Sequence, residues 1–376
     1  MIKTKLLIYN ENERKQKLLM KVNNGNDLLI LFNKFSRIKK IDSLINAINK
    51  FQQYLHFDFY KTLFPLIIEW SMEYETDELT IMEKGTSSEM IFTAKEARYW
   101  LANTFIMNSD RYHKSNYGEL SFAELYNGTS LGEEKLLCIL CYFYQATQLD
   151  ENRQIGFYRY IVENSQVQFN SEKKIDLNVV TIHTNSMENI NANAFVNFAN
   201  KQLSYGVINS CTQEEILNVC CPETYLALLF IESMNDNEVI IIRGARRYST
   251  YTGYLHCFKW KGMYTDTLFQ DQIGLDACTS NHFSTNKVNR DILKALTGFK
   301  MSSNNYPIII STGNWGCGAF GGDVIHKFLQ QILAASIVPG VKLYYSTFGD
   351  ITTATNLNYV MNYIVKYQIT IGRLYE

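Results

Sequence analysis

Residues 193–222 read NAFVNFANKQLSYGVINSCTQEEILNVCCP, and this stretch decides how the second half of the chain folds. Its start, residues 194–199, is apolar and aromatic with polar interruptions, which indicates a buried strand. The tripeptide Ser204-Tyr205-Gly206 then breaks the pattern, and Thr212-Gln213-Glu214-Glu215 precedes a second apolar run. The stretch therefore predicts a strand, a turn and a helix that begins with two adjacent glutamates.

Two interpretations of the paired glutamates are open. In the first they are structural: Thr212 caps the helix, Glu215 reaches back to its amide in a capping box, and the helix dipole favours Glu214. In the second they are functional, because carboxylates beside a helix N-terminus and a turn that can hold an anion are what a glycosidic site needs.

A second stretch, STGNWGCGAFGGD at residues 311–323, is harder to explain as structure alone. Five glycines lie between Gly313 and Asp323, where a turn needs one or two, so the backbone is free to wrap closely round a ligand. A predicted core strand, Tyr306–Ile310, precedes the loop, and a helical pattern follows Asp323. This is the topology of a phosphate cradle, without the Walker lysine or a GxGxxG pattern.

GNWGCGAFGGD and TQEEI together resemble the pair of signatures of the poly(ADP-ribose) glycohydrolase family, whose catalytic core is an elaborated macrodomain. Other segments agree with the family in order and spacing. They are FANK at Phe198, YSTYTGY at Tyr248, LDACTSNHF at Leu275 and YSTFGD at Tyr345. A weaker likeness extends through the helical segments from about Phe64.

The resemblance implies a substrate and a set of site residues. The substrate is poly(ADP-ribose), cut by water at its ribose–ribose O-glycosidic bond, with Glu215 as proton donor and Glu214 on the ribose hydroxyls. An adenine contact is implied near Met187 and Glu188. The other implied binding residues are Gln213, Asn200, Asn197, Gly206, Tyr254, Asn314, Gly316, Gly318, Ala319, Phe320 and Phe348. Backbone amides of the glycine residues and their neighbours would hold the diphosphate, and Phe348 would stack on the adenine.

Two departures from the family pattern keep a second function open. The family has three glycines where this chain has Ser204-Tyr205-Gly206, and it usually has aspartate where this chain has Asn197. The alternative is a catalytically impaired macrodomain that binds ADP-ribose or serves as a structural subunit of an assembly. A nucleoside-triphosphate enzyme is disfavoured, because the lysine of a Walker loop is missing.

Composition narrows the class of protein. The chain has 376 residues, of which 46% are hydrophobic, and only four prolines, as expected for a globular protein of one or two domains. A net charge of −1 gives no basic footprint for duplex nucleic acid. We therefore expect poly(ADP-ribose) or ADP-ribose as partner and no duplex nucleic acid, and the sequence leaves protein partners open.

The sequence also predicts an intracellular protein, cytoplasmic or nuclear. The first twenty residues lack a long apolar core, and no apolar run reaches the length of a membrane span, so we expect neither a secretory signal nor membrane insertion. Cys138 and Cys141 lie on an apolar helical face with no second pair to complete a zinc site. We expect buried thiols, a packing role for Cys317, and neither metal nor cofactor.

Domain organisation follows from the periodicity. Residues 41 to about 148 are predicted to be mostly helical, with a break or first turn at Pro65, a capping box at Thr93 and a helix over Glu133–Thr147. The pattern weakens between Gln148 and Ile175, so we place an N-terminal region and helical accessory domain at 1–165 and the macrodomain at 166–376.

After residue 170 predicted strands and helices alternate, which predicts an α/β fold: a three-layer α/β/α macrodomain with a mixed sheet. The predicted strands include Ile175–Thr184, Glu238–Arg243 and Lys342–Phe348. The ligand cleft should open at the C-terminal ends of the strands, where the Gly206 turn and the Gly313 loop meet.

Overall fold

The structure is a computed structural model of the 376-residue chain. It describes residues 3–5, 11–36, 38–76, 78–108, 120–148, 150–162, 169, 171–203, 210–303 and 307–376. The predicted turn at Ser204-Tyr205-Gly206 and the residue Tyr306 lie outside the described residues.

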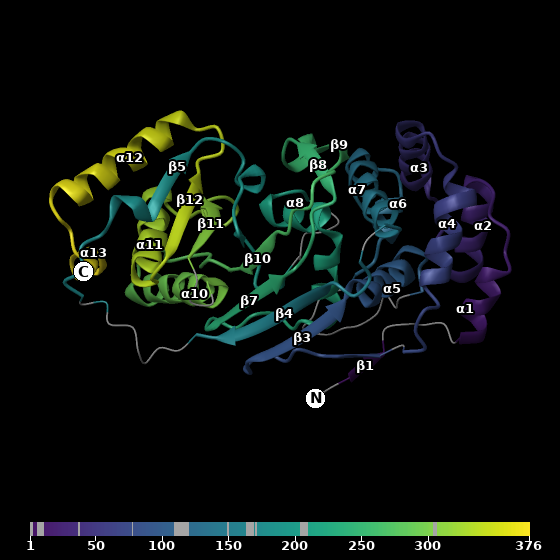
Figure 1. The fold of residues 1–376 in the computed structure, drawn as a ribbon, viewed down its shortest axis with the longest axis horizontal. Coiled ribbons are helices and arrows are strands. Elements are labelled where there is room, and N and C mark those ends of the chain that lie inside the picture. Colours follow the sequence, from purple (N-terminus) through teal and green to yellow (C-terminus); the bar gives the residue numbers. More distant parts are fainter. Residues whose placement is uncertain are drawn as a thin grey trace.

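An eight-stranded mixed sheet forms the centre of the molecule (Figure 1). Its spatial order is β3-β4-β7-β10-β6-β11-β12-β5. The strands are β3 (Ser88–Thr93), β4 (Gln154–Ile161), β5 (Val180–His183), β6 (Ala194–Asn197), β7 (Glu238–Arg243), β10 (Asp271–Gly274), β11 (Ile308–Gly313) and β12 (Val341–Ser346). Strands β10, β6, β11, β12 and β5 pair in parallel, and β10, β7, β4 and β3 pair antiparallel. The predicted mixed sheet is confirmed.

Side-chain alternation along the strands gives the sheet two buried faces. In β7, Ile240 and Ile242 join one hydrophobic core and Val239 joins another. The core around Val239 contains α10 (Thr285–Ser303) and α11 (Val324–Ile337). The opposite face meets α8 (Gln213–Cys220) and the N-terminal helices, which gives the three layers expected from the alternation of elements.

The N-terminal helices stand at one end of the sheet (Figure 1). They are α1 (Glu11–Leu18), α2 (Gly25–Ser36), α3 (Asp42–Leu55), α4 (Phe59–Trp70), α5 (Ala94–Phe105), α6 (Ala123–Tyr126) and α7 (Ser130–Ala146). The predicted capping box at Thr93 begins α5, with the Thr93 amide donating to Glu96 Oε2 at 2.7 Å. Cys138 and Cys141 are buried free thiols in α7, as predicted.

The predicted break at Pro65 is wrong, because Pro65 lies inside α4. Pro65 is on the exposed side of the helix, so the carbonyl that loses its amide partner can be hydrated. Burial of the other face, which includes Leu63, Phe64 and Ile67, outweighs the lost hydrogen bond.

Three strands of the sheet were not foreseen, because no strand was predicted for the stretch that forms β10 and two more were missed. Strand β3 falls in a region predicted to be helical, and β4 falls where the pattern weakens before the predicted boundary at residue 165. Strand β3 lies at the sheet edge, and only Phe92 in it is fully buried, so its sequence carries little apolar periodicity. A short additional sheet pairs β1 (Lys3–Lys5) with β2 (Glu78–Thr80).

The hairpin of β8 (Ser249–Thr252) and β9 (Lys259–Met263) packs on α7 and carries Tyr254 between its strands. Its position depends on Glu134 of α7, which accepts a 2.8 Å hydrogen bond from the Trp260 amide. The chain closes with α12 (Ile351–Lys366) and α13 (Ile371–Tyr375), and α12 packs beside edge strand β5. Four short 3-10 turns, η1 (Leu177–Val179), η2 (Met187–Asn189), η3 (Pro222–Leu226) and η4 (Leu255–Cys257), and one-turn helix α9 (Ala227–Phe230) complete the described elements.

Candidate functional site

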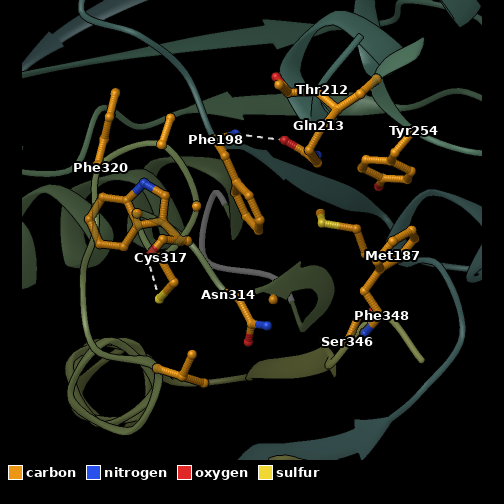
Figure 2. Close-up of a pocket in the computed structure, with 17 residues that line it drawn as sticks. Met187, Phe198, Thr212, Gln213, Tyr254, Asn314, Cys317, Phe320, Ser346 and Phe348 are labelled. Atoms are coloured by element: carbon orange, nitrogen blue, oxygen red, sulfur yellow. Dashed lines mark hydrogen bonds between the residues drawn. The ribbon is translucent and has the colours of Figure 1, made fainter. Parts of the chain in front are cut away.

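A cavity of about 650 Å³ opens where the parallel strands β6, β11 and β12 end. Figure 2 shows side chains from three walls pointing toward it: the glycine loop, the start of α8, and an aromatic wall. The lining residues are Met187, Phe198, Thr212, Gln213, Tyr254, Leu255, Gly313 to Phe320, Val324, Ser346 and Phe348. The cleft therefore lies at the strand ends, where it was predicted.

The glycine loop needs glycine at particular positions. Gly316 has a φ of +75°, and a Cβ built there would lie 2.5 Å from Ala277 Cβ, so no other residue fits without strain. Gly318 is different, because a Cβ at that position would meet no heavy atom within 4 Å. Packing inside the protein does not demand glycine at 318, whereas close approach of a ligand to the loop backbone would.

Several amides of this loop donate to no acceptor among the described residues. Inside the loop, the amides of Trp315, Cys317, Gly321 and Gly322 donate to loop carbonyls at 2.7 to 3.0 Å. The remaining amides, those of Asn314, Gly316, Gly318, Ala319 and Phe320, donate to none of the residues that the structure describes. All five residues line the cavity. A set of unpaired amides around a cavity is an anion-binding arrangement.

The N-terminus of α8 forms a second wall, and two side chains fasten it to the segment after β6. Gln213 accepts from the Phe198 amide at 2.8 Å and donates to the Val196 carbonyl at 3.1 Å (Figure 2 shows the first bond). Glu214 Oε2 accepts from the Asn200 amide at 3.0 Å. These contacts fix the first turn of α8, which carries both glutamates, relative to the end of β6.

The capping box predicted at Thr212 is confirmed. Glu215 Oε2 accepts from the Thr212 amide at 2.6 Å and also from the Thr212 hydroxyl. Glu215 Oε1 accepts no hydrogen bond from the described residues. Both Glu214 and Glu215 are only 4% exposed, and neither is among the residues that line the cavity.

The third wall is aromatic. The Tyr254 and Phe348 rings are in contact, with centroids 4.2 Å apart, and Phe348 is half exposed. Glu188 orients this wall, because its carboxylate accepts from the hydroxyls of Tyr251 at 2.8 Å and Tyr254 at 2.5 Å. Burial raises the pKa of Glu188, and the two tyrosine hydrogen bonds partly offset the effect. Met187, next to Glu188, completes the wall (Figure 2).

The predicted site residues separate into three groups. Eight line the cavity: Gln213, Tyr254, Asn314, Gly316, Gly318, Ala319, Phe320 and Phe348. Four others lie close by in the chain but not in the lining, namely Asn197, Asn200, Glu214 and Glu215. Gly206 lies outside the described residues. The Asn197 side chain is fully buried and donates to Gln272 Oε1 at 2.9 Å, away from the lining residues.

Some lining residues were not foreseen as binding residues. Phe198 directly follows β6 and Ser346 is the last residue of β12, and that position at a strand end was a usable signal. Leu255 and Val324 gave no signal in the sequence. Cys317, predicted to be a packing residue, lines the cavity, and burial raises the pKa of its thiol to about 12. The Cys317 thiol therefore stays protonated at neutral pH.

Within the described ranges, no group of three or more histidine, cysteine or acidic side chains is placed to hold a metal ion. No helix in the same part of the chain is long and apolar enough to cross a membrane.

Two family profiles match the chain. The profile described as poly(ADP-ribose) glycohydrolase (PARG), macro domain fold, matches residues 166–355. The profile described as poly(ADP-ribose) glycohydrolase (PARG), helical domain, matches residues 51–159.

The chain is also similar to individual proteins. It is 30% identical over 337 residues to poly(ADP-ribose) glycohydrolase 1 of Arabidopsis thaliana, covering 68% of this chain and 61% of the relative. It is 33% identical over 205 residues to poly(ADP-ribose) glycohydrolase 2 of Caenorhabditis elegans, covering 48% of this chain and 42% of that relative. The chain thus spans less than two thirds of the length of these relatives.

A solved poly(ADP-ribose) glycohydrolase from Deinococcus radiodurans, in complex with ADP-ribose, is 11% identical to the chain with a TM-score of 0.37. That match covers 52% of this chain and 88% of the other. On the profile matches, which together cover residues 51–159 and 166–355, the chain belongs to the poly(ADP-ribose) glycohydrolase family, with a macro domain fold preceded by a helical domain.

Proposed function

We propose that this chain is a poly(ADP-ribose) glycohydrolase, which hydrolyses the ribose–ribose O-glycosidic bond of poly(ADP-ribose) and releases ADP-ribose. Membership of the family supports this activity, as do the names of the relatives in Arabidopsis thaliana and Caenorhabditis elegans. The observation that carries the proposal is the glycine loop: five of its amides donate to none of the described residues, and their residues line a cavity next to the start of α8.

The loop supplies the diphosphate site. Amides of Gly316, Gly318, Ala319 and Phe320 have no acceptor among the described residues, and a diphosphate offers several oxygens that accept from such groups. Because Gly318 has open space where a side chain would lie, the ligand can approach its backbone closely. The diphosphate therefore lies along the loop, between the α8 wall and the aromatic wall.

The aromatic wall supplies the adenosine site. Half-exposed Phe348 offers a ring face for a base, and Tyr254 is held against it by its hydrogen bond to Glu188. Base stacking on an aromatic side chain contributes about 1 to 3 kcal/mol. With adenosine at this wall, the diphosphate reaches the loop and the second ribose points toward α8.

At α8 the two glutamates take separate roles, since adjacent residues cannot lie on opposite sides of one bond as the usual carboxylate pair does. Glu215 gives its proton to the departing ribose hydroxyl and then, as carboxylate, activates the attacking water. Its Oε2 atom is held by Thr212, which leaves Oε1 to carry the proton. Glu214 and Asn200, joined by a 3.0 Å hydrogen bond, bind ribose hydroxyls, and Gln213 holds the helix start in place.

A second candidate function is binding of ADP-ribose without hydrolysis. It is favoured by the capping box, because a carboxylate that already caps its own helix is committed to a structural bond. It is also favoured by the position of both glutamates outside the cavity lining and by Asn197, whose amide pairs with Gln272 in the core. The glycine loop and the aromatic wall serve this function equally well.

Release of ADP-ribose from purified poly(ADP-ribose) tests the two functions. The wild type is compared with Glu215→Gln, which removes the transferable proton but keeps the shape of the side chain. Glu96→Gln is a matched control, since Glu96 closes the same kind of capping box at Thr93 on α5, in the helical domain. We expect release by the wild type and by Glu96→Gln, and loss of release in Glu215→Gln.

Equal background from all three proteins would refute the hydrolase. In that case, calorimetric titration with ADP-ribose decides the second function: heat of binding that saturates supports a binding macrodomain, and no heat refutes it as well.

A further inference from the structure

Lys327 lies directly beneath the glycine loop. It is in the first turn of α11, its side chain is 0% exposed, and its amide donates to the Asp323 carbonyl at 2.9 Å. A lysine with no exposed surface is rare unless its charge is paired, so its surroundings need an explanation.

The aliphatic stem of Lys327 supports the loop from below. A Cβ built on Gly316 would lie 3.4 Å from Lys327 Cε, and one built on Gly322 would lie 3.2 Å from the same atom. The Gly322 amide donates to the Gly316 carbonyl at 2.9 Å, which closes the loop over the stem. The Lys327 ammonium also lies 4.9 Å from the centre of the Trp315 ring, a cation–π distance.

The ammonium end of Lys327 is anchored in the core. It donates to Asp291 Oδ2 and, at 3.1 Å, to Gln330 Oε1. Asp291 in turn accepts from the Cys278 amide at 3.2 Å and from Arg290 at 2.7 Å. Burial would raise the pKa of Asp291, but Lys327 and Arg290 hold the pKa below its usual value, so the carboxylate stays ionised.

We propose that Lys327 is a positioning residue, which holds the glycine loop in the shape that presents its unpaired amides to a diphosphate. The inference rests on the proposed function, since the diphosphate is part of the proposed substrate. Lys327 itself does not line the cavity. Its side chain lies against Gly316, Trp315 and Gly322, and because Asp291 holds its ammonium in place, it restrains these three loop residues.

The experiment measures the affinity of ADP-ribose, ADP and adenosine by calorimetry. Lys327→Met keeps an unbranched apolar stem but removes the charge and the anchor. Asp291→Asn keeps Lys327 and weakens the anchor, so it serves if Lys327→Met does not fold. The matched control is Lys294→Met, because Lys294 is also 0% exposed and pairs with a different carboxylate, Asp276. Urea unfolding of each variant reports the change in stability.

We expect Lys327→Met and Asp291→Asn to bind ADP-ribose and ADP about tenfold or more weakly, with adenosine binding unchanged. Lys294→Met should lose stability without this selective loss. Equal affinities in Lys327→Met and wild type would overturn the inference, as would a parallel loss for adenosine, since a general structural role lowers all three affinities. A wild type that binds none of the ligands refutes the proposed function and the inference together, whereas binding without hydrolysis refutes only the hydrolase.

Discussion

Replacing Gln213 by methionine tests whether the joint between β6 and α8 determines the site. The substitution keeps the length of the side chain but removes both of its hydrogen bonds, one to the Phe198 amide at 2.8 Å and one to the Val196 carbonyl at 3.1 Å. Each lost bond costs about 1 kcal/mol, and slightly more for the buried Val196 carbonyl, so unfolding should become easier by about 2 kcal/mol. That is a large part of the total for a marginally stable domain.

The same change should slow hydrolysis more than it weakens binding. Gln213 is the residue that ties the start of α8 to the strand end, and small misplacement of a catalytic group lowers its rate strongly. We expect release of ADP-ribose from poly(ADP-ribose) to fall by about tenfold to a hundredfold.

Urea unfolding and the release assay measure both effects. Gln52→Met is the control: Gln52 Oε1 accepts from the Phe59 amide at 2.7 Å, a bond of the same kind in the helical region. It should lose about 1 kcal/mol of stability and keep full activity. A Gln213→Met protein within about 0.5 kcal/mol of wild type, with unchanged release, would show that these two bonds do not hold the joint.

Three further predictions concern other parts of the structure. Gly316→Ala should destabilise the chain by about 2 to 4 kcal/mol, because φ of Gly316 is +75° and the new Cβ meets Ala277. Gly318→Ala should change the stability by less than about 0.5 kcal/mol, because open space surrounds the new Cβ. Equal losses of stability for the two variants in urea unfolding would contradict the argument. Phe348→Ala should weaken ADP-ribose binding by about 1 to 3 kcal/mol in calorimetry. Its stability should change little, because the Phe348 ring is half exposed. An unchanged affinity would show that Phe348 is not part of the site. Burial lowers the pKa of Lys17 to about 7, with Glu13 acting in the opposite direction. Between about pH 7 and 10 the unfolded chain therefore binds more protons than the native one, so the stability of the wild type should rise with pH, by up to about 1.4 kcal/mol per pH unit. Urea unfolding at pH 7 and 9 should show a steeper rise for the wild type than for Lys17→Met. Equal slopes would show that the pKa of Lys17 is not lowered in this way.

Predictions that depend on local sequence were confirmed. The run EVIIIR forms strand β7 over Glu238–Arg243, as predicted. The helix predicted after Asp323 is α11, and the structure adds that the Asp323 side chain caps it, accepting from the His326 amide at 2.8 Å. Both capping boxes are present, at Thr93 and Thr212. In each case the deciding contacts join residues within a few positions of one another, so a short window of sequence contains them.

Predictions that depend on distant packing were less successful. Strand β4 alternates weakly, yet it lies inside the sheet, where Arg159 forms a fully buried ion pair with Glu238 of β7. An arginine in a strand gives no sign of burial until its partner is known. Pro65 likewise ends many helices, but here the buried face of α4 maintains the helix through it.

The position of the cavity and eight of its seventeen lining residues could be predicted, from the glycine loop, the strand ends and the resemblance to the family. The roles within it could not be separated from sequence alone. Glu188 orients Tyr254, whereas the sequence indicated only an approximate adenine contact there. Lys327 supports the loop, whereas the sequence placed it only within a helix. Domain limits at residue 165 stay a prediction, with β3 and β4 of the sheet lying before it.

By itself the sequence determined the family, the alternation of strands and helices, the glycine loop and the capping boxes, because each depends on neighbouring residues and backbone preferences. Only the tertiary structure decided which loop amides remain unpaired, that Asn197 pairs with Gln272, and that Lys327 and Asp291 meet beneath the loop. Those facts arise from segments far apart in the chain that pack together, and a hydrogen-bond or ion-pair partner is defined only once both segments are in place.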